Sequence, residues 1–283
     1  MKVIHIEPTD VCNAACPQCL RIFDSTFNST VHNHLTVKQI ADMHLNISAL
    51  DKMFMCGDYG DPAAGKHTIE IYEYFRLQNP NITLGMNTNG GLRGKSFWQQ
   101  LAKLTSNKSD YVIFSIDGLE DTNHIYRRNV NWHTVMQNVN IYIQSGGRAH
   151  WDMLVFEHNE HQVNDCQQLA QDMGFKWFRA KVSKRHQEMP VDFLHPPKGW
   201  QDPVVKHGKI RCQALEDQSI YINAHGKLYP CCYLGPTAYT LDRFTEVQQS
   251  WNNKSIHTCV HTCSANEVGT SFTNQWQREI QFK

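Results

Sequence analysis

The chain has 283 residues, enough for one large domain or two modest ones with a substantial buried core. Hydrophobic residues make up 41% of it, and 27 basic residues balance 27 acidic ones, which argues against a disordered chain and against a nucleic-acid partner. The first residues enter a strand pattern at once, and no run approaches the apolar length of a membrane span. We therefore expect a cytoplasmic protein without a membrane partner.

The ten cysteines are expected to serve metal binding or catalysis, because the cytoplasm keeps thiols reduced and disfavours a disulfide framework. Two of them, Cys56 and Cys166, stand alone in the sequence. We expect these two to be packing thiols.

From Val3 to about Val182, short β-rich runs alternate with longer segments of helical periodicity, such as a helix over Val163-Met173 followed by Gly174. The predicted strands are Val3-Ile6, Lys52-Cys56, Ile82-Asn87, Tyr111-Ile116, Asp152-Phe156 and Trp177-Val182. This alternation predicts an α/β fold, a partial (β/α)6 TIM-type barrel with fewer units than the full eight-stranded one. Because the loops after parallel strands gather at one edge of the sheet, motifs that follow the strands should share one pocket.

Directly after the first strand, three cysteines stand close together at Cys12, Cys16 and Cys19. Spacings of three and two residues let one short loop place three sulfurs around one centre, but they supply one ligand fewer than a closed structural site takes. A metal centre held there would keep an open position. The alternative is a zinc knuckle or a set of core cysteines.

This triplet resembles the signature of the radical S-adenosylmethionine (SAM) superfamily. The resemblance implies that Cys12, Cys16 and Cys19 hold three irons of a [4Fe–4S] cluster and that the fourth iron chelates SAM. It also implies a partner that donates electrons, such as flavodoxin or ferredoxin. A [4Fe–4S] cluster and SAM are therefore the expected cofactors.

The second strand is followed by Cys56-Gly57-Asp58-Tyr59-Gly60-Asp61-Pro62, which as a pattern alone could be an ordinary turn. It resembles the superfamily's Gly-Gly-Glu-Pro motif, which presents backbone carbonyls to the amino group of SAM. The resemblance makes Gly57, Tyr59, Gly60 and Asp61 candidates for SAM binding. Tyr59 replaces the commoner glycine and Asp61 the commoner glutamate.

The fourth strand ends in Ser115-Ile116-Asp117-Gly118, so a hydroxyl and a carboxylate share one side of the strand. Such a pair could bind ribose hydroxyls or the SAM carboxylate. The stretch from Asp117 to Arg128 resembles a superfamily pattern whose arginine pairs with a SAM carboxylate, and the spacing favours Arg128 over Arg127. The alternative places both arginines on a solvated helix face.

Closely spaced prolines and glycines break the periodicity between Lys184 and Pro203. We predict a core over residues 1–183, a linker over 184–205 and a small cysteine-rich domain with a tail over 206–283. Inside the last part, strands over Ile220-Ile222 and Lys227-Tyr229 are predicted to form a hairpin that returns Cys231 towards Cys212.

The spacing that opens this C-terminal part resembles the twitch and SPASM domains that follow many radical SAM cores, which implies a second, auxiliary [4Fe–4S] cluster. We expect its ligands to be Cys212, Cys231, Cys259 and Cys263. Cys232 should face the other way, because neighbouring strand residues point to opposite faces. It would then be a packing thiol or a redox or catalytic group. A zinc ribbon is the alternative reading of the four thiols.

The resemblance implies an enzyme of oxidoreductase type that cleaves SAM to a 5′-deoxyadenosyl radical and abstracts hydrogen from a substrate carbon, leading to oxidation, epimerisation or cross-linking. The substrate is expected to be a small molecule or a peptide. A maturase that relies on a separate leader-binding protein and a zinc-stabilised binding module without SAM chemistry are the alternatives. The motifs identify no catalytic acid or base, because the residues that read the substrate lie outside them.

Overall fold

The structure, a computed structural model, describes residues 1–24, 27, 30–183, 185–186, 188–200, 209–263 and 280–282. Of the predicted linker, residues 184, 187 and 201–205 lie outside the described residues. The same is true of most of the predicted tail that follows Cys263.

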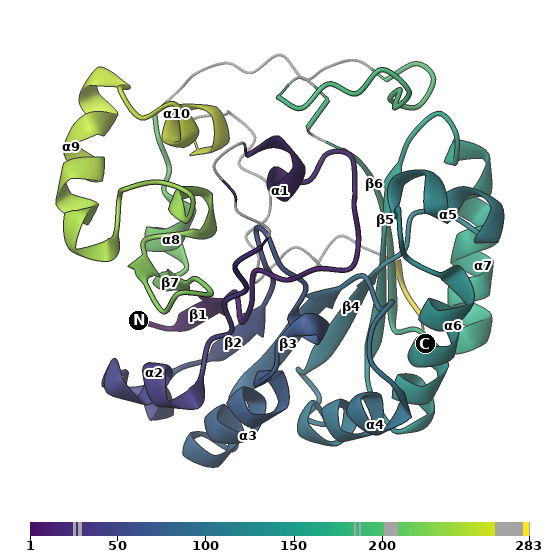
Figure 1. Cartoon of the computed structure of the whole chain (residues 1–283), viewed down its shortest axis with the longest axis horizontal. Coiled ribbons are helices and arrows are strands. Elements are labelled where there is room, and N and C mark those ends of the chain that lie inside the picture. The colour runs from purple at the N-terminus through teal and green to yellow at the C-terminus, as the bar shows by residue number, and fades with distance from the viewer. Residues whose placement is uncertain are drawn as a thin grey trace.

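Within the described residues, nine strands form one sheet in the order β8-β7-β1-β2-β3-β4-β5-β6-β9 (Figure 1). The strands are β1 Val3–Ile6, β2 Lys52–Met55, β3 Thr83–Thr88, β4 Tyr111–Ser115, β5 Ala149–Val155, β6 Trp177–Val182, β7 Ser219–Ile222, β8 Leu228–Tyr229 and β9 Ile280–Gln281. Strands β1 to β6 run parallel to their neighbours, whereas β8 and β9 are antiparallel additions at the two ends. The predicted partial barrel is confirmed.

The predicted strands match the observed ones within one residue at each end, except β5. This strand begins at Ala149, three residues before the predicted start at Asp152. His150 and Asp152 are polar yet almost fully buried, because they face the inner side of the curved sheet. These polar residues interrupt the hydrophobic pattern, so the early part of the strand was not predicted.

Helices cover the convex side of the sheet, with α3, α4, α6 and α7 outside the row of strands in Figure 1. The helices are α1 Leu20–Phe23, α2 Val37–Asp42, α3 Thr68–Gln78, α4 Lys95–Leu104, α5 Glu120–Tyr126, α6 Trp132–Gln144, α7 Val163–Met173, α8 Gln213–Glu216, α9 Phe244–Asn253 and α10 His257–Cys263. The predicted bounds of α7 are confirmed, and Gly174 ends it at φ 87°, a left-handed conformation that glycine adopts without strain.

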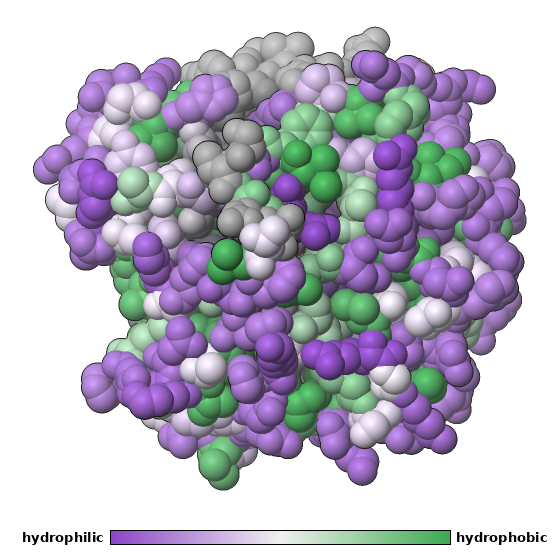
Figure 2. Space-filling model, in the orientation of Figure 1, coloured by the Kyte–Doolittle hydropathy of each residue, from purple (hydrophilic) through white to green (hydrophobic). Residues whose placement is uncertain are grey.

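The main hydrophobic core lies between the strands and these helices and includes Ile4, Ile6 and Trp98, all fully buried. Figure 2 shows mostly hydrophilic side chains over the visible face, with hydrophobic ones in small separate groups. Among the helices of the described residues, none combines the length and the apolar composition needed to span a lipid bilayer.

The alternate residues of the strands line the inner side of the curved sheet, which we call the lumen. On β1, for example, His5 lies between Ile4 and Ile6 and stacks on Phe54 of β2 at 4.3 Å between ring centroids. The lumen also holds ion pairs, such as that between Asp152 and Arg179. Its lining is therefore far more polar than the helix-facing core.

The predicted C-terminal hairpin is confirmed, since β7 and β8 pair antiparallel through Tyr221 and Tyr229. Strand β7 also pairs in parallel with β1, so the hairpin extends the barrel sheet. The pairing of β7 with β1 is made by hydrogen bonds between strands that lie far apart in the sequence. The proposed division of the chain into three parts stays a prediction.

We predict that Gly85→Ala lowers the free energy of unfolding by about 2 to 3 kcal/mol, as overpacking of a buried site does. A Cβ at Gly85 would lie 2.6 Å from Cζ of Tyr111, whose ring is fixed between Gly85 and His150. Urea unfolding followed by circular dichroism measures the effect. Gly94→Ala is the control, because a Cβ there meets no atom within 4 Å; a loss as large as that of Gly85→Ala would contradict the packing argument.

Candidate active site

The loop that carries Cys12, Cys16 and Cys19 begins just past the end of β1 and is fixed by long-range hydrogen bonds. The backbone N–H of Ala15 donates to the carbonyl of Arg128 at 2.9 Å, beyond the end of α5. The guanidinium of Arg21 donates to the carbonyls of Cys12 and Ala14. The three thiols therefore sit on a loop tied to two other elements of the barrel.

Hydrogen-bond donors contact the sulfurs of two of the three cysteines. Cys12 Sγ accepts from the N–H of Ala14 at 3.4 Å and from Nδ2 of Asn89 at 3.6 Å. Cys16 Sγ accepts from Arg127 at 3.7 Å. Such donors stabilise thiolate ligands and tune an iron–sulfur cluster, so this set of residues fits the [4Fe–4S] group that the sequence predicts.

Burial raises the pKa of Cys12 to about 12 and also raises that of Cys16. Without a metal both thiols are therefore protonated at neutral pH. Metal ligands are thiolates, so loading a cluster at this loop must release protons.

The glycine-rich loop after β2 is held by Glu7, a buried carboxylate just past the end of β1. Its Oε1 accepts from the backbone N–H groups of Tyr59 at 2.7 Å and Gly60 at 3.1 Å. A Cβ on Gly60 would lie 1.8 Å from the carbonyl oxygen of Thr9, so only glycine permits this approach. In the structure Gly60 thus serves the contact between the glycine-rich loop and the cysteine loop.

Two further candidates of this loop, Tyr59 and Asp61, are also tied to the protein. The hydroxyl of Tyr59 donates to Asp24 at 2.5 Å. The carboxylate of Asp61 accepts from the hydroxyl of Thr88 and from the N–H of Asn89, both at 2.7 Å. Asp61 therefore joins the loop after β2 to the end of β3, and through Asn89 it supports the donor to Cys12.

Asp117 is fully buried at the end of β4 and uses both carboxylate oxygens within the protein. One accepts from the N–H of Leu154 and the other from Nε of Arg127, each at 2.6 Å. Its partner is therefore Arg127, whereas the exposed Arg128 stacks over the ring of Phe193 at 4.4 Å. Arg127 bridges Asp117 to Cys16. The pairing of Arg128 with a SAM carboxylate, which the spacing favoured, stays a prediction.

Ser115 lies at the end of β4 beside Asp152 of β5, inside the lumen. Burial alone would raise the pKa of Asp152, but Lys181 and Arg179 together lower it to about 2. The contacts are 2.7 Å from Arg179 Nε and 2.7 Å from Lys181 Nζ. Two cations thus face one carboxylate, so this wall of the lumen carries a net positive charge and Lys181 is its more exposed member.

The four cysteines predicted to bind an auxiliary cluster lie near one another, since Cys231 interacts electrostatically with Cys263, Cys212 and Cys259. Cys232 faces elsewhere and packs with Tyr221 and Tyr229. Within the described residues, no three His, Cys, Asp or Glu side chains are arranged to hold a single metal ion. A cubane offers four separate iron corners, so its thiolates need not converge on one point.

Glu7 is a contributor to the site that the sequence motifs did not single out, and Arg127 is the arginine that the spacing did not favour. Glu7 stands between the first strand and the cysteine triplet, and its burial at 2% exposure is the signal of its role. Nothing in the local sequence distinguishes such a carboxylate from a solvated one, because its partners are 52 and more residues away.

Comparisons with known proteins agree with this geometry. A family model described as "Radical SAM superfamily" matches residues 6–170. No curated protein matches the chain.

Three solved structures share the fold. SuiB of Streptococcus suis, bound to S-adenosylmethionine, has a TM-score of 0.61 and 13% identity over 90% of this chain and 66% of its own. Native anSMEcpe with bound AdoMet has a TM-score of 0.60 and 13% identity over 98% and 94% of the two chains. BtrN in complex with AdoMet and 2-DOIA has a TM-score of 0.53 and 11% identity over 99% and 98%.

Since the family model covers more than half of the sequence and spans the cysteine triplet and the ends of β1 to β5, this chain belongs to the radical SAM superfamily.

Proposed function

We propose that this enzyme cleaves SAM reductively and uses the resulting 5′-deoxyadenosyl radical to abstract hydrogen from a substrate carbon. The observation that carries the proposal is the cysteine loop, which presents three thiols at the carboxyl ends of parallel strands, with N–H donors to the sulfurs of Cys12 and Cys16. A [4Fe–4S] cluster on that loop would supply the electron and an open iron position. The chain's own residues bind and orient SAM and the substrate and exclude water.

Cys12, Cys16 and Cys19 are the proposed cluster ligands. For SAM we propose the glycine-rich loop, Ser115 and Arg127, the first of the two arginines after α5. In this proposal Asp117 positions Arg127, because its carboxylate is fully occupied inside the protein. Arg127 uses Nε on Asp117 and one terminal nitrogen on Cys16, which leaves its other terminal nitrogen for a carboxylate of SAM.

The substrate is proposed to be a peptide or a small molecule, with an electron donor such as flavodoxin or ferredoxin. Support comes from the structural neighbours, since SuiB has been solved with its precursor peptide SuiA, anSMEcpe with the Cp18Cys peptide and BtrN with 2-DOIA. A second [4Fe–4S] cluster on Cys212, Cys231, Cys259 and Cys263 completes the proposal.

The triple variant Cys12→Ala, Cys16→Ala, Cys19→Ala is expected to hold about half of the roughly eight irons of the reconstituted wild type, because one of two four-iron clusters is lost. Iron is measured after anaerobic reconstitution. Cys166→Ala should keep all the iron, because it removes a fully buried core thiol that is far in sequence from both the N-terminal and the C-terminal cysteines. Undiminished iron in the triple variant would show that the N-terminal loop binds none.

Arg127→Met is expected to weaken SAM binding at least tenfold, since a charge-assisted hydrogen bond contributes about 1.5 to 3 kcal/mol. Arg128→Met is the matched control and should change the affinity little, because its side chain is exposed and lies on Phe193. Equilibrium dialysis of SAM against samples of equal iron content measures both. A larger loss in Arg128→Met would return the role to Arg128.

Cys231→Ser is expected to lose the auxiliary cluster, and with it about four of the roughly eight irons. Cys232→Ser should keep that iron, since its sulfur packs with Tyr221 and Tyr229. Iron content and visible absorbance of the two variants decide the matter. The reverse pattern would make Cys232 the ligand, and full iron with lost activity in Cys232→Ser would assign that thiol a catalytic role.

A further inference from the structure

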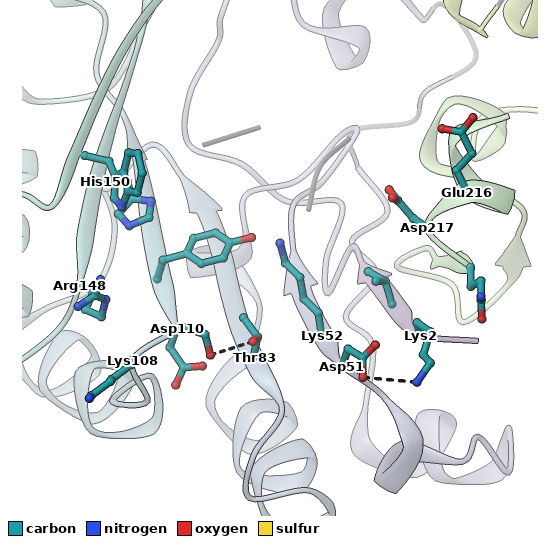
Figure 3. Close-up of a pocket in the computed structure, with 15 residues that line it drawn as sticks. Lys2, Asp51, Lys52, Thr83, Lys108, Asp110, Arg148, His150, Glu216 and Asp217 are labelled. Carbon is teal, nitrogen blue, oxygen red and sulfur yellow. Dashed lines mark hydrogen bonds and ion pairs between the residues drawn. The ribbon is translucent and has the colours of Figure 1, made fainter. Parts of the chain in front are cut away.

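A pocket of about 620 Å³ opens at the end of the barrel opposite the cysteine loop (Figure 3). It is lined by the first residues of five strands, Val3, Lys52, Thr83, Tyr111 and Trp177, together with His150 near the start of β5. We call it the basal pocket. Its volume lies in the range of small-molecule sites, yet it is at the wrong end of the strands for SAM chemistry.

A layer of buried side chains closes the lumen above the basal pocket. His5 stacks on Phe54 at 4.3 Å and meets Tyr221 edge to face at 4.8 Å, and all three are at most 6% exposed. Beside them, Arg179 and Asp152 form their buried ion pair. The basal pocket is therefore separate from the proposed active site.

Most acidic groups of the basal pocket already have cationic partners. Asp51 lies 3.6 Å from Lys2, and Glu216 lies 3.0 Å from Arg211. Asp110 pairs with Arg76 and also accepts from the backbone N–H of Leu84 at 2.7 Å. These acids therefore repel an incoming anion only weakly.

The lining has four cationic and four acidic side chains, and the balance is positive because Arg76 and Arg211, outside the lining, neutralise two of the acids. Burial lowers the pKa of Lys52 to about 8, while the nearby Asp217 raises it, so the amine is mostly protonated at pH 7. The charges of Lys52 and Asp217 therefore balance each other. Lys108 and Arg148 have no ion-pair partner among the described residues. Figure 3 shows these two on the side of the pocket opposite Glu216 and Asp217.

Tyr111 is an uncharged aromatic residue of the same lining. Tyr111 is 6% exposed, and its hydroxyl finds no hydrogen-bond partner among the described residues. Its ring lies against Gly85 and stacks with His150 at 5.3 Å between centroids. That hydroxyl is closed off from solvent, so Tyr111 offers the pocket the face of its ring and no hydrogen bond.

We propose that the basal pocket binds a small organic anion, whose phosphate or carboxylate oxygens contact Arg148 and Lys108. The planar wall of Tyr111, His150 and Trp177 accommodates the organic part. The site is independent of SAM chemistry.

The test uses the reconstituted full chain and titrates inorganic pyrophosphate and citrate by calorimetry at low ionic strength. The wild type is expected to bind one of these probes at a single site. The double variant Arg148→Gln, Lys108→Gln should bind it about a hundredfold more weakly, at about tenfold for each lost charge-assisted contact. Tighter binding of pyrophosphate assigns a phosphate ligand, and tighter binding of citrate a polycarboxylate.

The matched control is Lys95→Gln, Lys103→Gln, which removes two exposed positive charges from α4 and should leave the affinity unchanged. Equal weakening in both double variants, or no binding of either probe to the wild type at millimolar concentration, would overturn the proposal. SAM affinity, measured on the same samples, should be equal in all of them.

Discussion

The carboxylate of Glu7 is the contact on which the geometry of the site depends. One oxygen holds the glycine-rich loop through two backbone N–H groups, and the other accepts from the hydroxyl of Tyr221 at 2.9 Å. Glu7 therefore joins β1, the loop after β2 and strand β7 of the C-terminal hairpin. Burial raises the pKa of Glu7 and, together with Glu7 itself, raises that of the neighbouring Asp58 well above its usual value. Two adjacent buried carboxyls favour one shared proton over two full charges.

Asp61 and Asp117 follow the same physical principle at the ends of other strands. Each is almost fully buried and has both oxygens hydrogen-bonded. The donors to Asp61 are Thr88 and Asn89 at the end of β3. Those to Asp117 are Arg127 and Leu154, from two different segments. A buried carboxylate is tolerated only where such donors compensate for lost hydration. Its loss would therefore release a loop as well as leave several donors unpaired. Motif residues that resemble ligand contacts thus also build the scaffold that positions Asn89 and Arg127 against the cysteine sulfurs.

The two ends of the barrel lumen differ in their chemistry. At the carboxyl ends of the strands, thiols, N–H donors and the cationic wall of Arg179 and Lys181 surround the proposed cluster and SAM site. At the amino ends, charged side chains surround the basal pocket. The aromatic layer of His5, Phe54 and Tyr221 lies between them and is buried tightly enough to keep the two ends apart.

The spacing of nearby residues in the sequence determined most of the strand bounds, those of helix α7 and the superfamily motif. Alternating patterns gave the bounds of β1, β6 and α7, and three closely spaced cysteines after a strand led to the superfamily that the family model confirms. These features depend on residues within a few positions of one another. The hairpin was expected to return Cys231 towards Cys212, and the role of the four C-terminal thiols as cluster ligands stays a prediction.

The tertiary structure alone decided which charged groups meet. The choice of Arg127 as the partner of Asp117 depends on how α5 ends, and the roles of Glu7 and Asp61 depend on donors contributed by other strands and loops. The pairing of β7 with β1 joins residues more than 200 positions apart. The basal pocket likewise exists only because the starts of several strands converge. A linear pattern records the spacing of neighbours, but hydrogen bonds, ion pairs and cavities form between residues that only the folded chain brings together.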